Sequence, residues 1–177
     1  MADEFNPEYL QGGYSRRDAF AFAAACDLAY QIKPASAIVE ATLKQQWGFT
    51  DVTIINKYLG GRIDTQGFVA ANEGNILVAF AGSESFSDWW ANVTFIAEPG
   101  PFKETKVHKG FKDALVPTLV RIAADSQKYN LNGEKKIWVA GHSLGGALAV
   151  LLTATLLADG IPVAGLYTYG APRVGNS

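Results

Sequence analysis

The stretch from Lys136 to Ala158 constrains the fold of this chain more than any other feature of the sequence. It begins with KIWVA, a short run rich in strand-forming residues, continues through the glycine-rich turn GHSLGG, and ends in the apolar run ALAVLLTATLLA. A buried strand that turns directly into a helix is a basic unit of an α/β fold. We therefore expect one strand and one helix here, packed closely across the turn.

The turn itself carries a pattern that indicates chemistry. Residues 141–145, GHSLG, fit G-x-S-x-G, in which a nucleophilic serine occupies a strained strand-to-helix turn. Side chains in place of Gly141 or Gly145 would collide with the neighbouring strand and helix, and Gly146 permits close packing too. Because a helix N-terminus favours negative charge, the turn predicts that Ser143 is a nucleophile that attacks a carbonyl group.

The rest of the chain supports an α/β architecture. Ser15 or Asp18 can cap a first helix, and Pro34 suits the first turn of a second one. Periodicity and composition predict helices over 18–31, 34–47, 111–129 and 144–158, strands over 52–59, 76–81 and 137–141, a further strand before a turn at 73–75, a loop over 97–110 and a last buried strand over 163–170. We expect a mixed, largely parallel sheet flanked by helices, in a single domain over 1–177.

Composition limits the partners of the chain. Apolar residues make up 49% and charged residues 18% of its 177 residues, and the net charge is −2. This balance is typical of a globular protein, and the lack of a basic surface argues against a nucleic-acid partner. The longest apolar run, 147–158, is shorter than the roughly 18 residues of a membrane span. We expect neither nucleic-acid binding nor a transmembrane segment.

The single cysteine and the N-terminal residues bear on cofactors and location. Cys26 leaves no cysteine cluster for zinc, and its apolar neighbours predict a buried, unreactive thiol. We expect neither a metal nor an organic cofactor. The N-terminus has no basic segment followed by an apolar run, so it shows no secretory signal, and we expect a cytoplasmic location.

Four segments together resemble one enzyme family. They are VAFAGSES (78–85), VHKGF (107–111), VAGHSLGGALAVLL (139–152) and YTYGAPRVGN (167–176). Their order and spacing are similar to those of the class 3, or fungal-type, lipases, and the similarity spans roughly residues 68–177. The resemblance implies an α/β-hydrolase fold and hydrolysis of carboxylic esters of lipids.

The resemblance also implies roles for three residues. Ser143 matches the family nucleophile. Ser83 matches the residue whose backbone N–H, supported by its hydroxyl, forms one half of the oxyanion hole, and Leu144 supplies the other backbone N–H. Many members carry arginine where this chain has Ala81. We expect that departure to weaken support of the loop rather than the oxyanion donors.

A further segment, residues 85–95, resembles the family lid, a short amphipathic helix that covers the nucleophile. Two adjacent tryptophans cannot share one helix face, so at least one ring could meet solvent or lipid. Two interpretations stay open: opening of the lid exposes apolar surface to a lipid aggregate, or both rings pack into the core. The lid residues that the resemblance implies are Ser87, Asp88, Trp89, Trp90, Asn92 and Val93.

A base for Ser143 is harder to find. In α/β-hydrolases the acid and the histidine follow the serine, but residues 144–177 contain one acid, Asp159, and no histidine. Asp159 lies about 24 Å from Ser143 along a helix. The side chain of His142 diverges from its neighbour at a sharp turn, and His108 matches a family position with a structural role. We therefore expect the chain to stop before the catalytic Asp and His and to be a poor enzyme.

Two functions remain open from the sequence. In the first, the chain is the N-terminal part of a serine lipase that acts on lipid esters, at a lipid–water interface, through an acyl-enzyme. In the second, it is a lipase-like protein that ends natively near Ser177 and binds a lipid or a protein without turnover. Reading the gene beyond Ser177 for an in-frame Asp and His would distinguish them.

Overall fold

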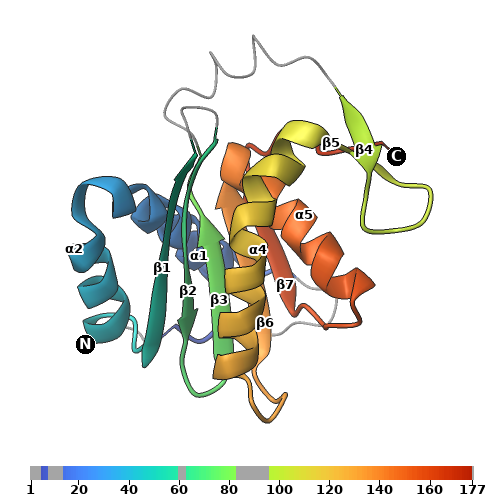
Figure 1. The fold of residues 1–177 in the computed structure, drawn as a ribbon. Helices are drawn as coiled ribbons and strands as arrows, with labels where there is room; N and C mark the ends of the chain where they lie inside the picture. The colour runs from blue at the N-terminus through green and yellow to red at the C-terminus, as the bar shows by residue number, and fades with distance from the viewer. Residues whose placement is uncertain (1–4, 8–13, 60–62, 83–95, 177) are drawn as a thin grey trace.

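A five-stranded mixed sheet forms the centre of the computed structural model, which describes residues 5–7, 14–59, 63–82 and 96–176 (Figure 1). Its strand order is β1-β2-β3-β6-β7. The strands span Asp51–Leu59 (β1), Ile63–Ala71 (β2), Asn75–Phe80 (β3), Lys136–His142 (β6) and Gly165–Tyr169 (β7). The helices span Arg16–Tyr30 (α1), Ile32–Gln45 (α2), Lys109–Tyr129 (α4) and Leu144–Ala158 (α5).

The sheet combines two kinds of pairing. The first three strands form an antiparallel meander, whereas β3 pairs with β6, and β6 with β7, in parallel. The parallel neighbours require crossover connections, which α4 and α5 provide. The carboxyl ends of β3, β6 and β7 consequently meet at one edge of the sheet, the region where open α/β sheets bind their ligands. The expected mixed sheet flanked by helices is confirmed.

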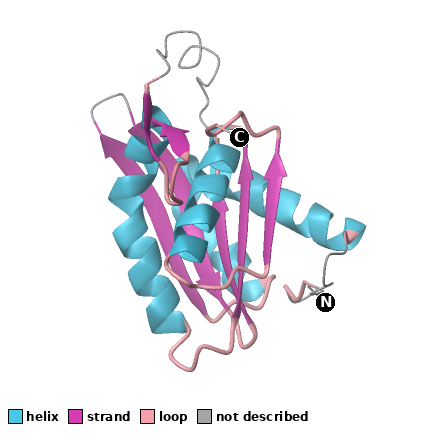
Figure 2. Cartoon of the chain, turned by 90° about the vertical axis from the view of Figure 1, so that its right-hand side faces the viewer, coloured by secondary structure: helices cyan, strands magenta, loops and turns pink. Residues whose placement is uncertain are grey.

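Helices cover both faces of the sheet and bury two separate apolar clusters (Figures 1 and 2). Strand β3 shows why: Ile76, Val78 and Phe80 belong to the cluster under α4 and α5. The alternate residues Leu77 and Ala79 belong to the cluster under α1 and α2. Because side chains alternate along a strand, an uninterrupted apolar run fits a strand that is buried on both faces.

The first two helices follow their sequence signals. The Ser15 hydroxyl accepts a hydrogen bond from the Asp18 N–H at 3.2 Å and caps α1, as predicted. Pro34 lies in the first turn of α2, and the helix is kinked at Ala35, with φ −155° and ψ 53°. Cys26 is buried in α1, which confirms its predicted burial, and burial raises the pKa of its thiol to about 12.

Two of our expectations about elements were wrong. Residues 97–110 do not form a loop: Ala97–Pro99 (β4) and Lys106–His108 (β5) pair as a two-stranded antiparallel sheet. Three residues are too few to show an alternating pattern in the sequence. Strand β7 is not buried; its residues alternate between half-buried and exposed, because it is the edge strand of the described sheet.

Candidate functional site at the turn between β6 and α5

Ser143 occupies the turn that joins β6 to α5. Its backbone has φ 54° and ψ −123°, outside the regions that L-residues favour, and its carbonyl accepts the Gly146 N–H at 2.9 Å. Only one other non-glycine residue in the described part of the chain, Glu104, has a positive φ. The turn therefore holds backbone strain at the predicted serine, which is the arrangement that presents a nucleophile clear of the sheet.

Glycines allow the turn to form because backbone occupies the space of their missing side chains. A Cβ on Gly145 would lie 2.5 Å from the Ala81 carbonyl oxygen and 2.6 Å from that of Phe80. A Cβ on Gly141 would overlap the Gly145 backbone, and one on Gly146 would lie 2.7 Å from the Ala171 Cβ. The predicted collisions at Gly141 and Gly145 and the close packing at Gly146 are confirmed.

The end of β3 lies directly against the serine. A Cβ on Gly82 would lie 2.9 Å from the Ser143 Cβ and 3.0 Å from the His142 carbonyl oxygen. Leu144 is the first residue of α5, at the helix end where N–H groups favour negative charge. Ser83, the other predicted oxyanion residue, lies outside the described residues, as do the predicted lid residues Ser87, Asp88, Trp89, Trp90, Asn92 and Val93.

A tyrosine from α1 completes this arrangement. The Tyr30 hydroxyl lies 2.7 Å from His142 Nδ1 and touches the space beside Gly82. Burial raises the pKa of Tyr30, and a hydrogen bond with the Gly82 backbone acts in the opposite direction. Tyr30 was not among the predicted site residues. Nothing local signals it, because 112 positions separate it from His142.

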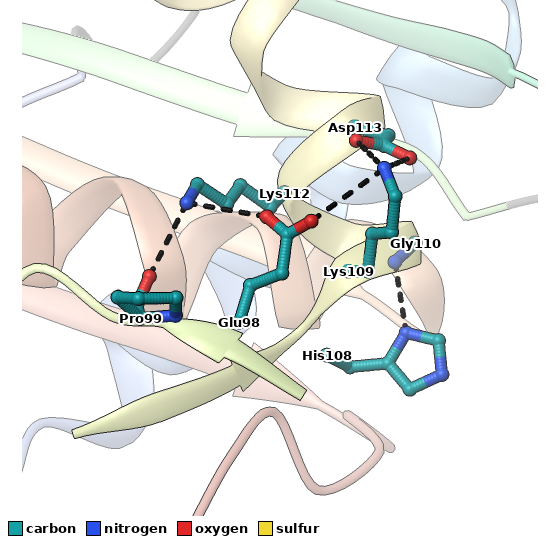
Figure 3. Close-up of polar contacts among 7 residues, drawn as sticks. All are labelled: Glu98, Pro99, His108, Lys109, Gly110, Lys112 and Asp113. Carbon is teal, nitrogen blue, oxygen red and sulfur yellow. Dashed lines mark hydrogen bonds and ion pairs between the residues drawn. The ribbon is translucent and has the colours of Figure 1, made fainter. Parts of the chain in front are cut away.

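The Nδ1 atoms of both histidines have hydrogen-bond partners other than Ser143. Within the described part of the chain, the Ser143 hydroxyl makes no hydrogen bond to His142 or His108. His108 is 3% exposed and caps α4, where its Nδ1 accepts the Gly110 N–H at 3.0 Å (Figure 3). Burial lowers the pKa of His108. The structural role predicted for His108 is confirmed.

A cluster of charged side chains connects the β4–β5 hairpin with α4. Glu98 lies 3.7 Å from Lys109 Nζ and 3.3 Å from Lys112 Nζ, and Lys109 also pairs with Asp113 at 2.6 Å (Figure 3). Lys112 donates a further hydrogen bond to the Pro99 carbonyl at 3.3 Å. The charged groups are between 32% and 45% exposed, so solvent weakens each pair, and the hairpin relies on several together.

Other parts of the resemblance motifs meet around the turn. The Ser143 N–H donates to the Tyr169 carbonyl at 2.8 Å, which connects the turn to the end of β7. The chain after β7 then reaches β5, where Gly175 forms a bridge with Val107. Asp159 is the C-cap residue of α5, at the opposite end of the helix from Ser143, as expected.

Two kinds of feature are absent from the residues that the structure describes: a membrane-spanning helix and a metal-binding cluster. No helix among them is both long and apolar enough to cross a membrane. No group of three or more His, Cys, Asp or Glu side chains in the same ranges could hold a metal ion. The described part of the site contains the Ser143 hydroxyl, the backbone N–H groups at the start of α5 and the pair formed by Tyr30 and His142.

Comparison with known proteins assigns the family. The sequence model of the family described as "Lipase (class 3)" matches residues 77–177. Secreted mono- and diacylglycerol lipase A of Penicillium cyclopium is 35% identical over an alignment of 150 residues that covers 78% of this chain and 45% of that protein. The chain thus spans less than half the length of this relative. The cytoplasmic location expected from the sequence stays a prediction.

Solved structures agree with the sequence matches. The lipase from Rhizopus microsporus var. chinensis superposes with a TM-score of 0.67 at 27% identity, over 90% of this chain and 57% of that one. A triacylglycerol lipase described as having a serine protease triad as its catalytic centre superposes with a TM-score of 0.65 at 28% identity, over 92% of this chain and 65% of that one. From its motifs, its strained serine turn and these matches, the chain belongs to the class 3 lipase family.

Proposed function

We propose that the protein is a serine hydrolase that cleaves carboxylic esters of lipids, with Ser143 as the nucleophile. The observation that carries the proposal is the backbone of Ser143, strained at φ 54° and ψ −123° between β6 and α5. A residue without a chemical role could relax this strain by substitution with glycine. Here the strained position holds a hydroxyl group at the carboxyl edge of the parallel strands.

The proposed reaction has two halves. The Ser143 Oγ forms a bond to the ester carbonyl carbon, its proton passes to a base, and collapse of the tetrahedral intermediate breaks the bond to the alcohol oxygen, which takes up a proton. Water then attacks the acyl-enzyme, releases the fatty acid and restores the Ser143 hydroxyl. Neither half needs an oxidant, a reductant or a metal ion in its balance.

Backbone donors stabilise the charge in both halves. The Leu144 N–H at the start of α5 is one proposed donor to the oxyanion, and the N–H of Ser83 is the other. Support for the second donor comes from Gly82, the residue before Ser83, which lies against the Ser143 Cβ. Because such donors are oriented before the reaction begins, they lower the barrier without a reorganisation cost.

The proposed base is not one of the two histidines of this chain. His142 Nδ1 is occupied by Tyr30, and His108 Nδ1 caps α4. An α/β-hydrolase without its base retains only the acceleration from binding and from its oxyanion donors. The proposed nucleophile Ser143 and the two proposed oxyanion donors therefore lie in this chain, and the base that takes the serine proton is not assigned.

Acylglycerols are the proposed substrate class. The support comes from relatives: one carries the name mono- and diacylglycerol lipase, and a similar structure is described as a triacylglycerol lipase. The predicted lid over residues 85–95 would serve such a substrate by exposing apolar surface at a lipid–water interface. Its position in the sequence, directly after the end of β3, is consistent with a cover for Ser143.

Labelling with a fluorophosphonate probe tests the nucleophile. The probe is added to two samples, the 177-residue chain and the longest product of its gene. Peptide mass spectrometry then identifies the modified residue and measures the rate at which it is modified. We expect the label on Ser143, and we expect Ser143→Ala to remove it. Ser126→Ala is the matched control, because Ser126 is a buried serine in α4 with no proposed role in the reaction.

The outcomes separate the candidate functions. Labelling of Ser143 together with hydrolysis of dispersed diacylglycerol, both lost in Ser143→Ala, supports the lipase. Binding of diacylglycerol without labelling or hydrolysis in either protein sample would contradict the proposal and favour a lipase-like binding protein. Hydrolysis that persists in Ser143→Ala would reject Ser143 as the nucleophile.

A further inference from the structure

The hydroxyl of Tyr30 is the point where three distant segments of the chain meet. It lies 2.7 Å from His142 Nδ1, at the end of β6. It also lies in the space that a Cβ on Gly82 would occupy, at the end of β3. Tyr30 itself is the last residue of α1. One polar atom thus contacts both strand ends that carry the proposed reaction machinery.

Gly82 has no side chain at the point where Tyr30 and Ser143 approach it. A Cβ there would overlap the Tyr30 hydroxyl and would lie 2.9 Å from the Ser143 Cβ. Gly82 directly precedes Ser83, and Ser143 directly precedes Leu144. The two residues that precede the proposed oxyanion donors therefore lie against each other.

The residues around Tyr30 hold its backbone in a fixed position. Its helix neighbours Cys26 and Ala29 are buried in the core under the sheet, with exposures of 2% and 0%. The cap residue Gln31 donates its N–H to the carbonyls of Ala29 and Leu28, which closes the end of α1. A tyrosine hydroxyl, whose ordinary pKa is about 10, is protonated at neutral pH and can take part in a hydrogen bond with His142; burial raises the pKa of Tyr30 further.

We propose that Tyr30 is a positioning residue that fixes the distance between the two halves of the oxyanion site, through the hydrogen bond to His142 and the contact with Gly82. The inference rests on the proposed function. Tyr30 does not touch the reacting atoms in this description. Its hydroxyl holds Gly82, the residue before one proposed donor, against the turn that carries the other.

The test compares Tyr30→Phe with Tyr129→Phe in the longest product of the gene. Tyr129 is the matched control: its hydroxyl also makes one tertiary hydrogen bond, to the Thr53 hydroxyl at 2.8 Å, but it lies at the far end of α4. Hydrolysis of a soluble p-nitrophenyl ester gives kcat and KM, and the melting temperature reports the structural cost of each change. Ser143→Ala sets the background.

A positioning role predicts a specific split. In Tyr30→Phe we expect kcat to fall about tenfold while KM changes by less than about twofold, because the interaction matters most when the oxyanion forms. Tyr129→Phe should lower the melting temperature about as much as Tyr30→Phe does, but it should not change kcat. In the double variant Tyr30→Phe with His142→Ala, the loss in kcat should be smaller than the product of the single losses, because the two groups act as a unit.

A spectroscopic readout checks the hydrogen bond independently of activity. The ring nitrogen shifts of His142, measured by NMR on the 177-residue chain, should change in Tyr30→Phe and stay constant in Tyr129→Phe. Unchanged kcat in Tyr30→Phe, with activity still dependent on Ser143, would overturn the positioning role and leave the proposed function standing. Activity that survives in Ser143→Ala would overturn the proposed function, and the inference with it.

Discussion

The turn at Ser143 and the β4–β5 hairpin are both short connections near the same end of the molecule, yet different forces hold them. At the turn, backbone contacts backbone: Gly145 lies against the carbonyls of Phe80 and Ala81, and a single added carbon has no room. At the hairpin, partly exposed charges of Glu98 and Lys112 hold the elements together. The first arrangement is steric and short-ranged, whereas the second is electrostatic and open to solvent.

This difference indicates that substitutions are tolerated less well at the Ser143 turn than in the charged cluster at the β4–β5 hairpin. A steric contact between backbones cannot be relieved by rotating a side chain, so even one methyl group is costly. An exposed ion pair gains little because water and salt compete with it, and the remaining charges of the cluster compensate for a lost partner.

Gly145→Ala should have the largest effect. The new Cβ would lie 2.5 Å from the Ala81 carbonyl oxygen and 2.6 Å from that of Phe80, the last residue of β3, which cannot shift without disturbing its pairing with β6. We expect a loss of about 3 kcal/mol in the free energy of unfolding, measured by urea denaturation. Gly74→Ala is the control, because nothing lies within 4 Å of a Cβ there. Equal losses in the two variants would show that the turn is not sterically closed.

Ser143→Gly should stabilise the protein while abolishing labelling at this position. Glycine adopts φ 54° and ψ −123° readily, so removal of the strain should add about 1 kcal/mol to the free energy of unfolding. Ser143→Ala keeps the strained backbone and loses the same hydroxyl, so it should not be stabilised. If the two variants unfold at the same urea concentration, the turn stores no strain.

His108→Asn should change how stability depends on pH. Burial lowers the pKa of His108, so the unfolded chain binds its proton more readily than the folded one, and stability from this group is present above about pH 6.5 and lost below it. Protonation would also convert Nδ1 from acceptor to donor and break its bond with Gly110. Asparagine keeps an acceptor for the cap but does not titrate.

The measurement for His108 is the melting temperature between pH 5 and 8. Wild type should lose stability on acidification faster than His108→Asn, and the two curves should run parallel at higher pH. Parallel curves over the whole range would mean that the proton on His108 does not distinguish the folded from the unfolded chain.

Glu98→Gln should have the smallest effect. The change removes the charge that Lys109 and Lys112 share but leaves Lys109 paired with Asp113. We expect a slight decrease in melting temperature at low salt that disappears near 1 M salt, where screening acts over about 3 Å. Lys44→Gln, which breaks an exposed pair with Glu40 in α2, is the control for a charge change elsewhere. A loss that persists at high salt would show that Glu98 acts through short-range hydrogen bonds rather than through screened charge, since glutamine has the same shape.

The same contrast explains which features could be predicted from the sequence. The start of α1 at Ser15, the burial of Cys26 and the unit β6–turn–α5 depend on neighbouring residues and on periodicity, and these predictions are confirmed. The β4–β5 hairpin was missed because three residues leave no periodic signal. The burial of β7 was predicted wrongly because an apolar run does not reveal its position in the sheet.

The sequence by itself determined the serine turn and its family, because the glycines and the serine stand at a fixed spacing within five residues, between a strand-like and a helix-like run, and that pattern is readable directly. Only the tertiary structure decided what surrounds the serine. Gly82 comes to Ser143 through the parallel pairing of β3 with β6, and Tyr30 reaches His142 because α1 packs across the same sheet. Contacts between residues so far apart depend on how the layers pack, and no local pattern of residues encodes that.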